Sequence, residues 1–165
     1  MKSLLVFVLA LIFLIPLART AFAAPAIDRR FPQSTRLPFQ GALQSNETYS
    51  MVSPTMYVIG NGSGESTQLG WAFTASYHTE VNLVDFSEAE TAEFTGANGD
   101  SLQAKGLGQS FEDRTPGMYN VVQIYTITGG TGQFAGARGT FTLKRLVSRD
   151  AGVASSTFEG YILLP

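Results

Sequence analysis

Few side chains in this sequence could carry out acid–base or nucleophilic chemistry, so the reaction types open to it are limited. The 165 residues include one histidine, His78, and no cysteine. Cysteine nucleophiles and thiolate metal sites are therefore excluded, and a zinc site would need three ligands from carboxylates or carbonyls, which is uncommon. His78 falls at the end of an expected strand, on the face opposite Tyr77, and no Gly-x-Ser-x-Gly segment occurs. We therefore expect a solvated histidine, no Ser-His-Asp triad, and no metal or other cofactor.

The carboxylates are the remaining acid–base candidates, and Glu47 is the one whose position is informative. It shares its alternation with Phe39 and Leu43, so it points to the same face of a strand unless a β-bulge reverses the order. A buried carboxylate is costly unless it is paired. An inward Glu47 would therefore be functional, or would bind an arginine such as Arg145 or Arg138. Because bulges are expected in a curved sheet, we favour the outward, solvated orientation.

Short segments of alternating apolar and polar residues, divided by Gly, Asn, Pro and Asp, predict an all-β domain. The expected strands cover 37–50, 54–62, 68–78, 91–94, 102–106, 118–128, 140–147 and 156–164, with a weaker candidate at 80–86. About eight strands joined by short turns fit either a sandwich or a barrel. Glycines within the strands favour the closed antiparallel barrel, because barrels use glycine to bend strands at corners.

Large aromatic side chains fall along these strands at positions that could line one interior. The set is Trp71, Phe73, Tyr77, Phe94, Tyr125, Phe141 and Phe158. In an eight-stranded barrel, such side chains either fill the centre or surround one small ligand. The residues leave both outcomes open: a packed core, or a cavity lined by these aromatics and Glu47.

One glycine-rich segment carries a family resemblance. Residues 129–139 read Gly-Gly-Thr-Gly-Gln-Phe-Ala-Gly-Ala-Arg-Gly between two strands, which resembles the signature of the dirigent proteins and, in a related form, of the allene oxide cyclases. The Ala97–Asp100 turn and the Phe158–Ile162 segment are similar to the exported bacterial branch of this barrel superfamily. The resemblance implies an eight-stranded barrel, a hydrophobic molecule held inside it, and assembly into homotrimers.

The glycine-rich segment also has an architectural interpretation. A tight reversal between two strands needs residues that tolerate positive φ. Phe134 could tuck into the barrel end as a plug, and Arg138 could donate hydrogen bonds to carbonyls that an irregular loop leaves unpaired. The structural residues expected here are Gly129, Gly130, Gly132, Phe134, Arg138 and Gly139.

The N-terminus is typical of a secretory signal peptide. An apolar run from Leu4 to Leu17 follows Lys2, and Ala21-Phe22-Ala23 matches the small-x-small pattern of a cleavage site. We expect cleavage after Ala23, a flexible leader at 24–36, and one barrel domain at 37–165, secreted or periplasmic and free of the membrane. Acidic residues outnumber basic ones by 13 to 11, without a basic cluster, which argues against a nucleic-acid partner.

Three functions remain compatible with these features. The first is a secreted module that binds a small hydrophobic molecule in its interior. The second is a cofactor-independent cyclase or isomerase of the allene oxide cyclase or dirigent type, which would work mainly by confinement and orientation. The third is a structural, oligomeric barrel without a ligand. A purely apolar cavity would favour the first, and convergence of Glu47, Tyr77, Tyr125 or an arginine on one point would favour the second.

Overall fold

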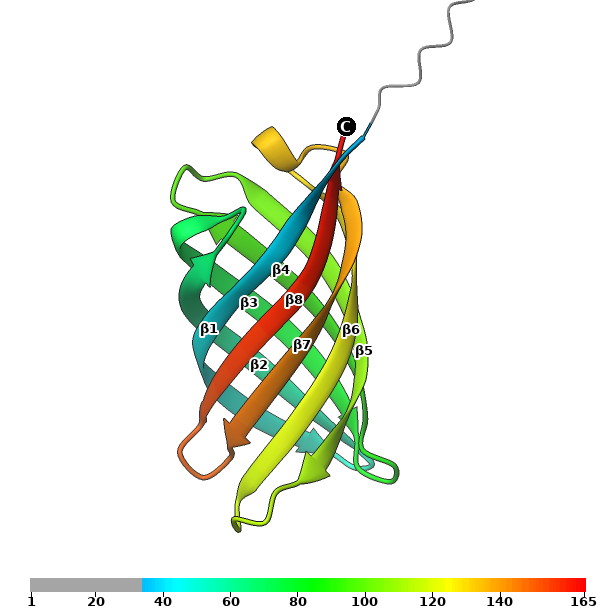
Figure 1. Cartoon of the computed structure of the whole chain (residues 1–165). Coiled ribbons are helices and arrows are strands. Elements are labelled where there is room, and N and C mark those ends of the chain that lie inside the picture. Colours follow the sequence, from blue (N-terminus) through cyan, green and yellow to red (C-terminus); the bar gives the residue numbers. More distant parts are fainter. Residues whose placement is uncertain (1–33) are drawn as a thin grey trace, which may run out of the picture. The chain divides into compact units, whose positions relative to one another are not determined.

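The computed structural model describes residues 34–165, which form one closed antiparallel β-barrel (Figure 1). Its strands are β1 (Thr35–Val52), β2 (Thr55–Ser66), β3 (Gly70–Asn82), β4 (Ser87–Gly96), β5 (Ser101–Glu112), β6 (Met118–Gly130), β7 (Arg138–Ser148) and β8 (Val153–Leu164). Each strand pairs with the next, and β8 pairs with β1. The predicted closed barrel of about eight strands is therefore confirmed.

Several strand boundaries differ from the sequence prediction; β2 runs on to Ser66 and β5 to Glu112, beyond the predicted ends at 62 and 106. β3 continues to Asn82 and 83–86 is a turn region, so the weak candidate at 80–86 is not a separate strand. β4 begins at Ser87, four residues before the predicted start. The expected signal peptide at 1–23 and most of the expected leader lie outside the described residues. No helix among residues 34–165 is long and apolar enough to cross a membrane.

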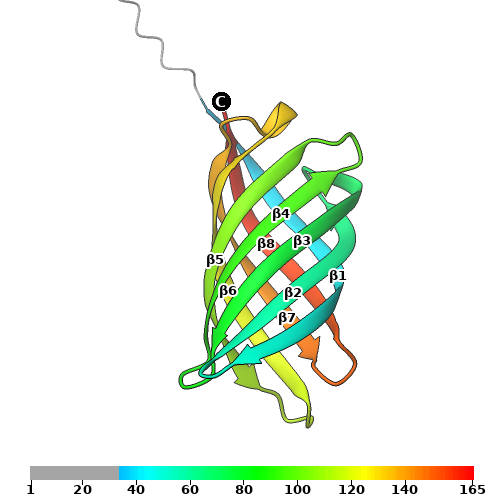
Figure 2. The ribbon, with the colours of Figure 1, turned by 180° about the vertical axis from the view of Figure 1, so that it is seen from behind.

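The barrel has two ends with different loops (Figures 1 and 2). The start of β1 and the end of β8 lie at one end, together with a short 3-10 helix, η1 (Gly132–Phe134); we call this the η1 end. The β1–β2, β3–β4, β5–β6 and β7–β8 turns lie at the other, which we call the pocket end. Side-chain alternation along the tilted strands then decides what fills the interior between them.

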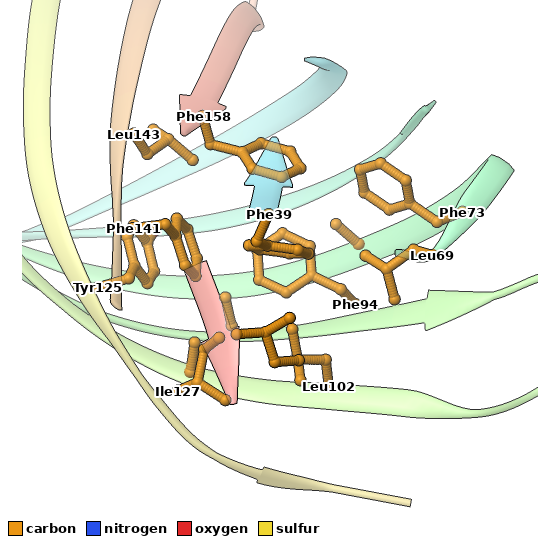
Figure 3. Close-up of a cluster of buried hydrophobic side chains, with 14 of the residues drawn as sticks. Phe39, Leu69, Phe73, Phe94, Leu102, Tyr125, Ile127, Phe141, Leu143 and Phe158 are labelled. Atoms are coloured by element: carbon orange, nitrogen blue, oxygen red, sulfur yellow. The ribbon is translucent and has the colours of Figure 1, made fainter. Parts of the chain in front are cut away.

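Aromatic rings fill the interior toward the η1 end (Figure 3). Phe39, Phe73, Phe94, Phe141 and Phe158 are each at most 3% exposed, and their ring centroids lie 5.0–6.2 Å apart in edge-on or tilted pairs. Such geometry is favoured by the quadrupoles of the rings. This half of the barrel is therefore a packed core.

The glycine-rich loop closes this end. Phe134 is buried against the same core, and the Arg138 guanidinium donates hydrogen bonds from Nη1 to the carbonyl oxygens of Thr128 (2.8 Å) and Ala137 (2.7 Å). Gly132 has φ +53°, and the Asp100 carboxylate occupies the place where its Cβ would lie. The loop therefore has the architectural role of joining β6 to β7 over the core.

Candidate functional site

The aromatic core gives way, toward the pocket end, to a layer of polar side chains that crosses the barrel interior. Its buried members are Ser45, Glu47, Tyr77, Thr79, Glu88, Glu90, Ser110, Gln123, Tyr125, Arg145 and Ser156. They come from every strand except β2, because alternation directs each of them inward. We call this set the polar layer.

Arg145 is the cation at the centre of the polar layer. Its Nη2 lies 3.1 Å from each carboxylate oxygen of Glu90, and its Nη1 lies 3.5 Å from Oε1 of Glu47. Its Cζ also lies 4.5 Å from the centroid of the Tyr77 ring. Burial opposes the charge, but the neighbouring anionic groups, Glu90 first, hold the pKa of Arg145 well above its usual value. The guanidinium is therefore a fixed positive charge that links β7 to β1 and β4.

Two glycines make room for the tyrosines of the layer. Gly60 pairs with Tyr77 across β2 and β3, and Gly106 pairs with Tyr125 across β5 and β6. A Cβ at either glycine would overlap the tyrosine ring. Tyr125 also stacks on Phe141, with ring centroids 4.7 Å apart. Pairing a strand glycine with a cross-strand aromatic ring fixes the ring and protects the exposed backbone.

The phenol groups of these tyrosines donate to the carboxylates. The Tyr77 hydroxyl donates to Glu47 Oε1 at 2.7 Å and lies 2.7 Å from Ser45 Oγ, and the Tyr125 hydroxyl donates to Glu90 Oε1. Burial raises the pKa of both tyrosines well above 10, and the neighbouring carboxylates raise it further. Both phenols therefore stay protonated and act as permanent hydrogen-bond donors.

The carboxylate oxygens of Glu47 and Glu90 accept hydrogen bonds from further side chains. Glu47 also accepts a hydrogen bond from the Tyr49 hydroxyl at 2.7 Å. Glu90 also accepts from Thr79 Oγ1 at 2.7 Å and from Gln123 Nε2 at 3.1 Å. With the arginine added, each carboxylate is held from at least three directions, so these two acids hold Arg145 in place.

Glu88 differs from the other two acids. Gln123 Nε2 donates to its Oε2 at 3.1 Å, and no arginine contacts it among the described residues. Burial is the main cause that raises the pKa of Glu88 to about 7, and nearby Glu90 and Glu47 add to the shift, while Arg145 and Ser110 partly oppose it. Both protonation states are therefore populated near neutral pH, which suits a group that gives and takes protons.

A small cavity opens beside Glu88 at the pocket end. Its volume is about 30 Å³, room for one or two water molecules. The polar side of its wall includes Glu47, Glu88 and Arg145, and the apolar side is formed by Met56, Val58, Val81, Val121 and Val147. Tyr49, Tyr119 and Arg149 complete the lining; all three are half-buried, and Arg149 lies over the Tyr119 ring at 4.4 Å. A molecule larger than one or two waters would fit here only if these side chains moved aside.

The charged groups of the polar layer are arranged around the Arg145 guanidinium. Among residues 34–165, no group of three or more His, Cys, Asp or Glu side chains is placed to hold a metal ion. The cation between the carboxylates is instead the Arg145 guanidinium. Glu88 lies on the cavity wall and has a raised pKa, so it is the candidate for proton transfer in this site.

The structure brings together three of the residues singled out from the sequence. Glu47, Tyr77 and Tyr125 lie in one connected network with Arg145. The outward orientation favoured for Glu47 is wrong, because β1 pairs with β2 and β8 without a register shift and its alternation is kept from Phe39 onward. His78 is exposed on the outer face, as expected.

The remaining aromatics do not join this network. Phe73, Phe94, Phe141 and Phe158 pack against one another in the core (Figure 3). Trp71 is not inside the barrel at all: its side chain is 93% exposed. The cause is a bulge, in which Trp71 and Ala72 on β3 oppose the single residue Glu65 on β2, so alternation restarts at Phe73. A ligand-lining role for the four phenylalanines stays a prediction.

Sequence reasoning missed Glu88, Glu90 and Gln123. The sequence did contain a signal for the first two. Glu88 and Glu90 alternate in step with Ala92 and Phe94, so a strand that begins at Ser87 would direct all four to the interior. Gln123 alternates in step with Val121 and Tyr125, but its amide alone gives no sign of a carboxylate partner.

Comparison with known proteins supports the fold. No protein-family model and no curated protein sequence matches the chain. Among solved structures, the barrel is similar to the pterocarpan synthase dirigent protein GePTS1, with a TM-score of 0.61 and 14% identity over 89% of this chain and 99% of that one. The resemblance inferred from the glycine-rich motif is thus confirmed at the level of the fold: the chain folds as a dirigent-type barrel.

Proposed function

We propose that the pocket end of this barrel binds a small, mainly apolar molecule with one oxygen-bearing group, and that Glu88 transfers a proton in an isomerisation or cyclisation without a cofactor. The observation that carries the proposal is the convergence of Glu88, Glu47 and Arg145 on one cavity that also has an aliphatic side, formed by Met56 and four valines. Aliphatic walls select an apolar body, while a few fixed polar groups orient it.

The chemistry follows from the different roles of the charged groups. Protonated Glu88 donates to one atom of the bound molecule and regains a proton from another atom of the same molecule, so no proton is consumed overall. Arg145 stabilises the carboxylate that Glu88 becomes between the two transfers, because its charge is fixed by Glu47 and Glu90. The enclosing walls supply orientation, which can lower a barrier without further functional groups.

The similar solved structure supports catalysis over binding alone. That protein is described as a synthase, so a barrel of this shape can serve an enzyme. The packed aromatic half supports the same site. Because phenylalanine rings fill that half, the polar layer and its cavity are the part of the interior left for a ligand. The proposed hydrophobic ligand therefore enters at the pocket end, away from the phenylalanine core.

Export and trimer assembly are further proposals. Export is supported by the apolar run and the Ala21-Phe22-Ala23 site in the sequence, and the trimer is supported by the resemblance alone. N-terminal sequencing of the protein from its host should begin at Ala24, and native mass spectrometry should give a mass three times that of the cleaved chain. An N-terminus at Met1 would overturn the first proposal, and a monomer mass the second.

The decisive experiment screens wild-type protein and Glu88→Gln against a panel of phenols, enones and epoxides. Thermal shift reports binding, and chiral chromatography reports conversion. We expect at least one compound to bind both proteins and to be converted only by wild type. Glu93→Gln, an exposed glutamate on the outer face of β4, is the matched control and should convert it normally. Binding without conversion by wild type would overturn catalysis and favour a binding module.

A further inference from the structure

The most exposed large hydrophobic side chain among residues 34–165 lies far from the polar layer. Trp71 is 93% exposed, although a tryptophan normally buries much of its large apolar surface. Its position is built into the backbone: the bulge opposite Glu65 turns it outward, and Gly70 before it has φ +92°, a conformation that favours glycine. The fold therefore uses two special backbone features to present one indole to solvent.

A depression of about 410 Å³ lies beside the indole, next to the β2–β3 turn at the η1 end. Its wall carries an amide from Gln40, a carboxylate from Glu65 and hydroxyls from Ser66 and Thr67. Thr67 is itself held in place, since its Oγ1 donates to the Pro38 carbonyl at 3.1 Å and accepts from the Gln40 backbone N–H at 3.2 Å. Within the described residues, the Gln40 and Glu65 side chains make no hydrogen bond.

This combination matches a sugar ring better than it matches other partners. A pyranose has one face of C–H bonds that stacks on an indole, and a rim of hydroxyls that pair with amides and carboxylates. A protein partner would need a cluster of apolar anchors, whereas Trp71 is the one aromatic residue on this depression in the described part of the chain. A quaternary ammonium would need an aromatic cage for the same reason.

We infer that the Trp71 depression is a carbohydrate-binding site, in which the indole stacks on one sugar unit of an oligosaccharide and Gln40 and Glu65 bond its hydroxyls. This site is independent of the proposed chemistry at Glu88, because it lies on the outside of the barrel near the η1 end. The barrel would then have two sites: an outer one that binds a glycan and an inner one that converts a small molecule.

The sole tryptophan makes the test direct, since all indole fluorescence comes from Trp71. The wild-type protein is applied to a printed array of β-glucan, chitin, mannan, galactan and peptidoglycan fragments, and any positive oligosaccharide is titrated in solution. We expect a blue shift of the emission and protection from acrylamide quenching. Trp71→Ala should weaken binding at least tenfold, and Gln40→Ala or Glu65→Gln three- to tenfold.

Two controls separate this site from the rest of the barrel. Tyr57→Ala removes an exposed aromatic side chain on β2 outside the depression, and Glu88→Gln alters the inner site; neither should change glycan binding. The inference is overturned if wild type binds no fragment on the array, or if Trp71→Ala binds as tightly as wild type.

Discussion

The two halves of the barrel interior are filled by different kinds of side chain. The η1 half is filled by phenylalanine rings that need no hydrogen-bond partners, and the pocket half is filled by three glutamates, an arginine and their donors. Both halves exclude most water, but only the second contains groups whose charge depends on pH. The first half therefore secures the closed sheet, and the second holds the ionisable groups on which the proposed function depends.

The largest expected effect comes from removing the central cation. Arg145→Met would leave Glu47 and Glu90 buried without their counter-charge, and loss of one partner of a buried pair costs about 3–5 kcal/mol. Urea unfolding at pH 8 measures this loss. Phe94→Ala in the other half should also cost about 3–5 kcal/mol, but without leaving a charge unpaired. An Arg145→Met variant as stable as wild type would contradict the comparison.

The next effect is the pH dependence due to Glu88. Its pKa is about 7 in the folded barrel and near 4.5 in the unfolded chain, so the folded state binds this proton more tightly. The stabilisation that Glu88 contributes is therefore complete below pH 4.5 and is lost as pH rises through 7, a change of about 3 kcal/mol. Glu88→Gln should remove this part of the slope, and Glu93→Gln should keep it. Equal slopes in wild type and Glu88→Gln would show that Glu88 is not perturbed. Catalysis by the protonated acid should likewise decline above pH 7.

A third, intermediate effect tests the boundary between the halves. Gly106→Ala would push a methyl group into the ring of Tyr125, which stacks on Phe141 on one side and donates to Glu90 on the other. Overpacking of this kind costs about 1–3 kcal/mol. Thermal unfolding measures the cost, and Gly99→Ala, at a turn glycine with open space but positive φ, separates crowding from backbone strain. An unchanged melting temperature for Gly106→Ala would mean that the tyrosine is not held by the glycine.

The smallest effect is expected outside the barrel. Trp71→Ala should change the free energy of unfolding by no more than about 0.5 kcal/mol, because the side chain is 93% exposed. Urea unfolding followed by circular dichroism suits this variant, since it lacks the fluorescent reporter. A loss above 1 kcal/mol would place the indole in the core after all.

The sequence predicted the barrel well because strand alternation and turn residues are local signals. Glu47 was open to prediction by the same rule, since β1 keeps its alternation from Phe39 through Glu47. The outward orientation of Trp71 could not be predicted in this way. The bulge at 71–72 depends on how β3 pairs with β2, and the residues of β3 alone do not indicate it. The contact between Arg145 and Glu90 could not be predicted from the sequence either. The two residues are 55 positions apart, and only closure of the sheet brings them together.

Closure of the sheet has one more consequence, for engineering. Thr35 and Leu164 are register partners on β1 and β8. A short linker could therefore join the start of β1 to the end of β8 without disturbing a strand. The chain could then be opened anew at the Asp150–Gly152 turn, giving a circular permutant with every strand pairing retained. Because the order of strands around the ring has no first or last member, the fold itself does not depend on where the polypeptide starts.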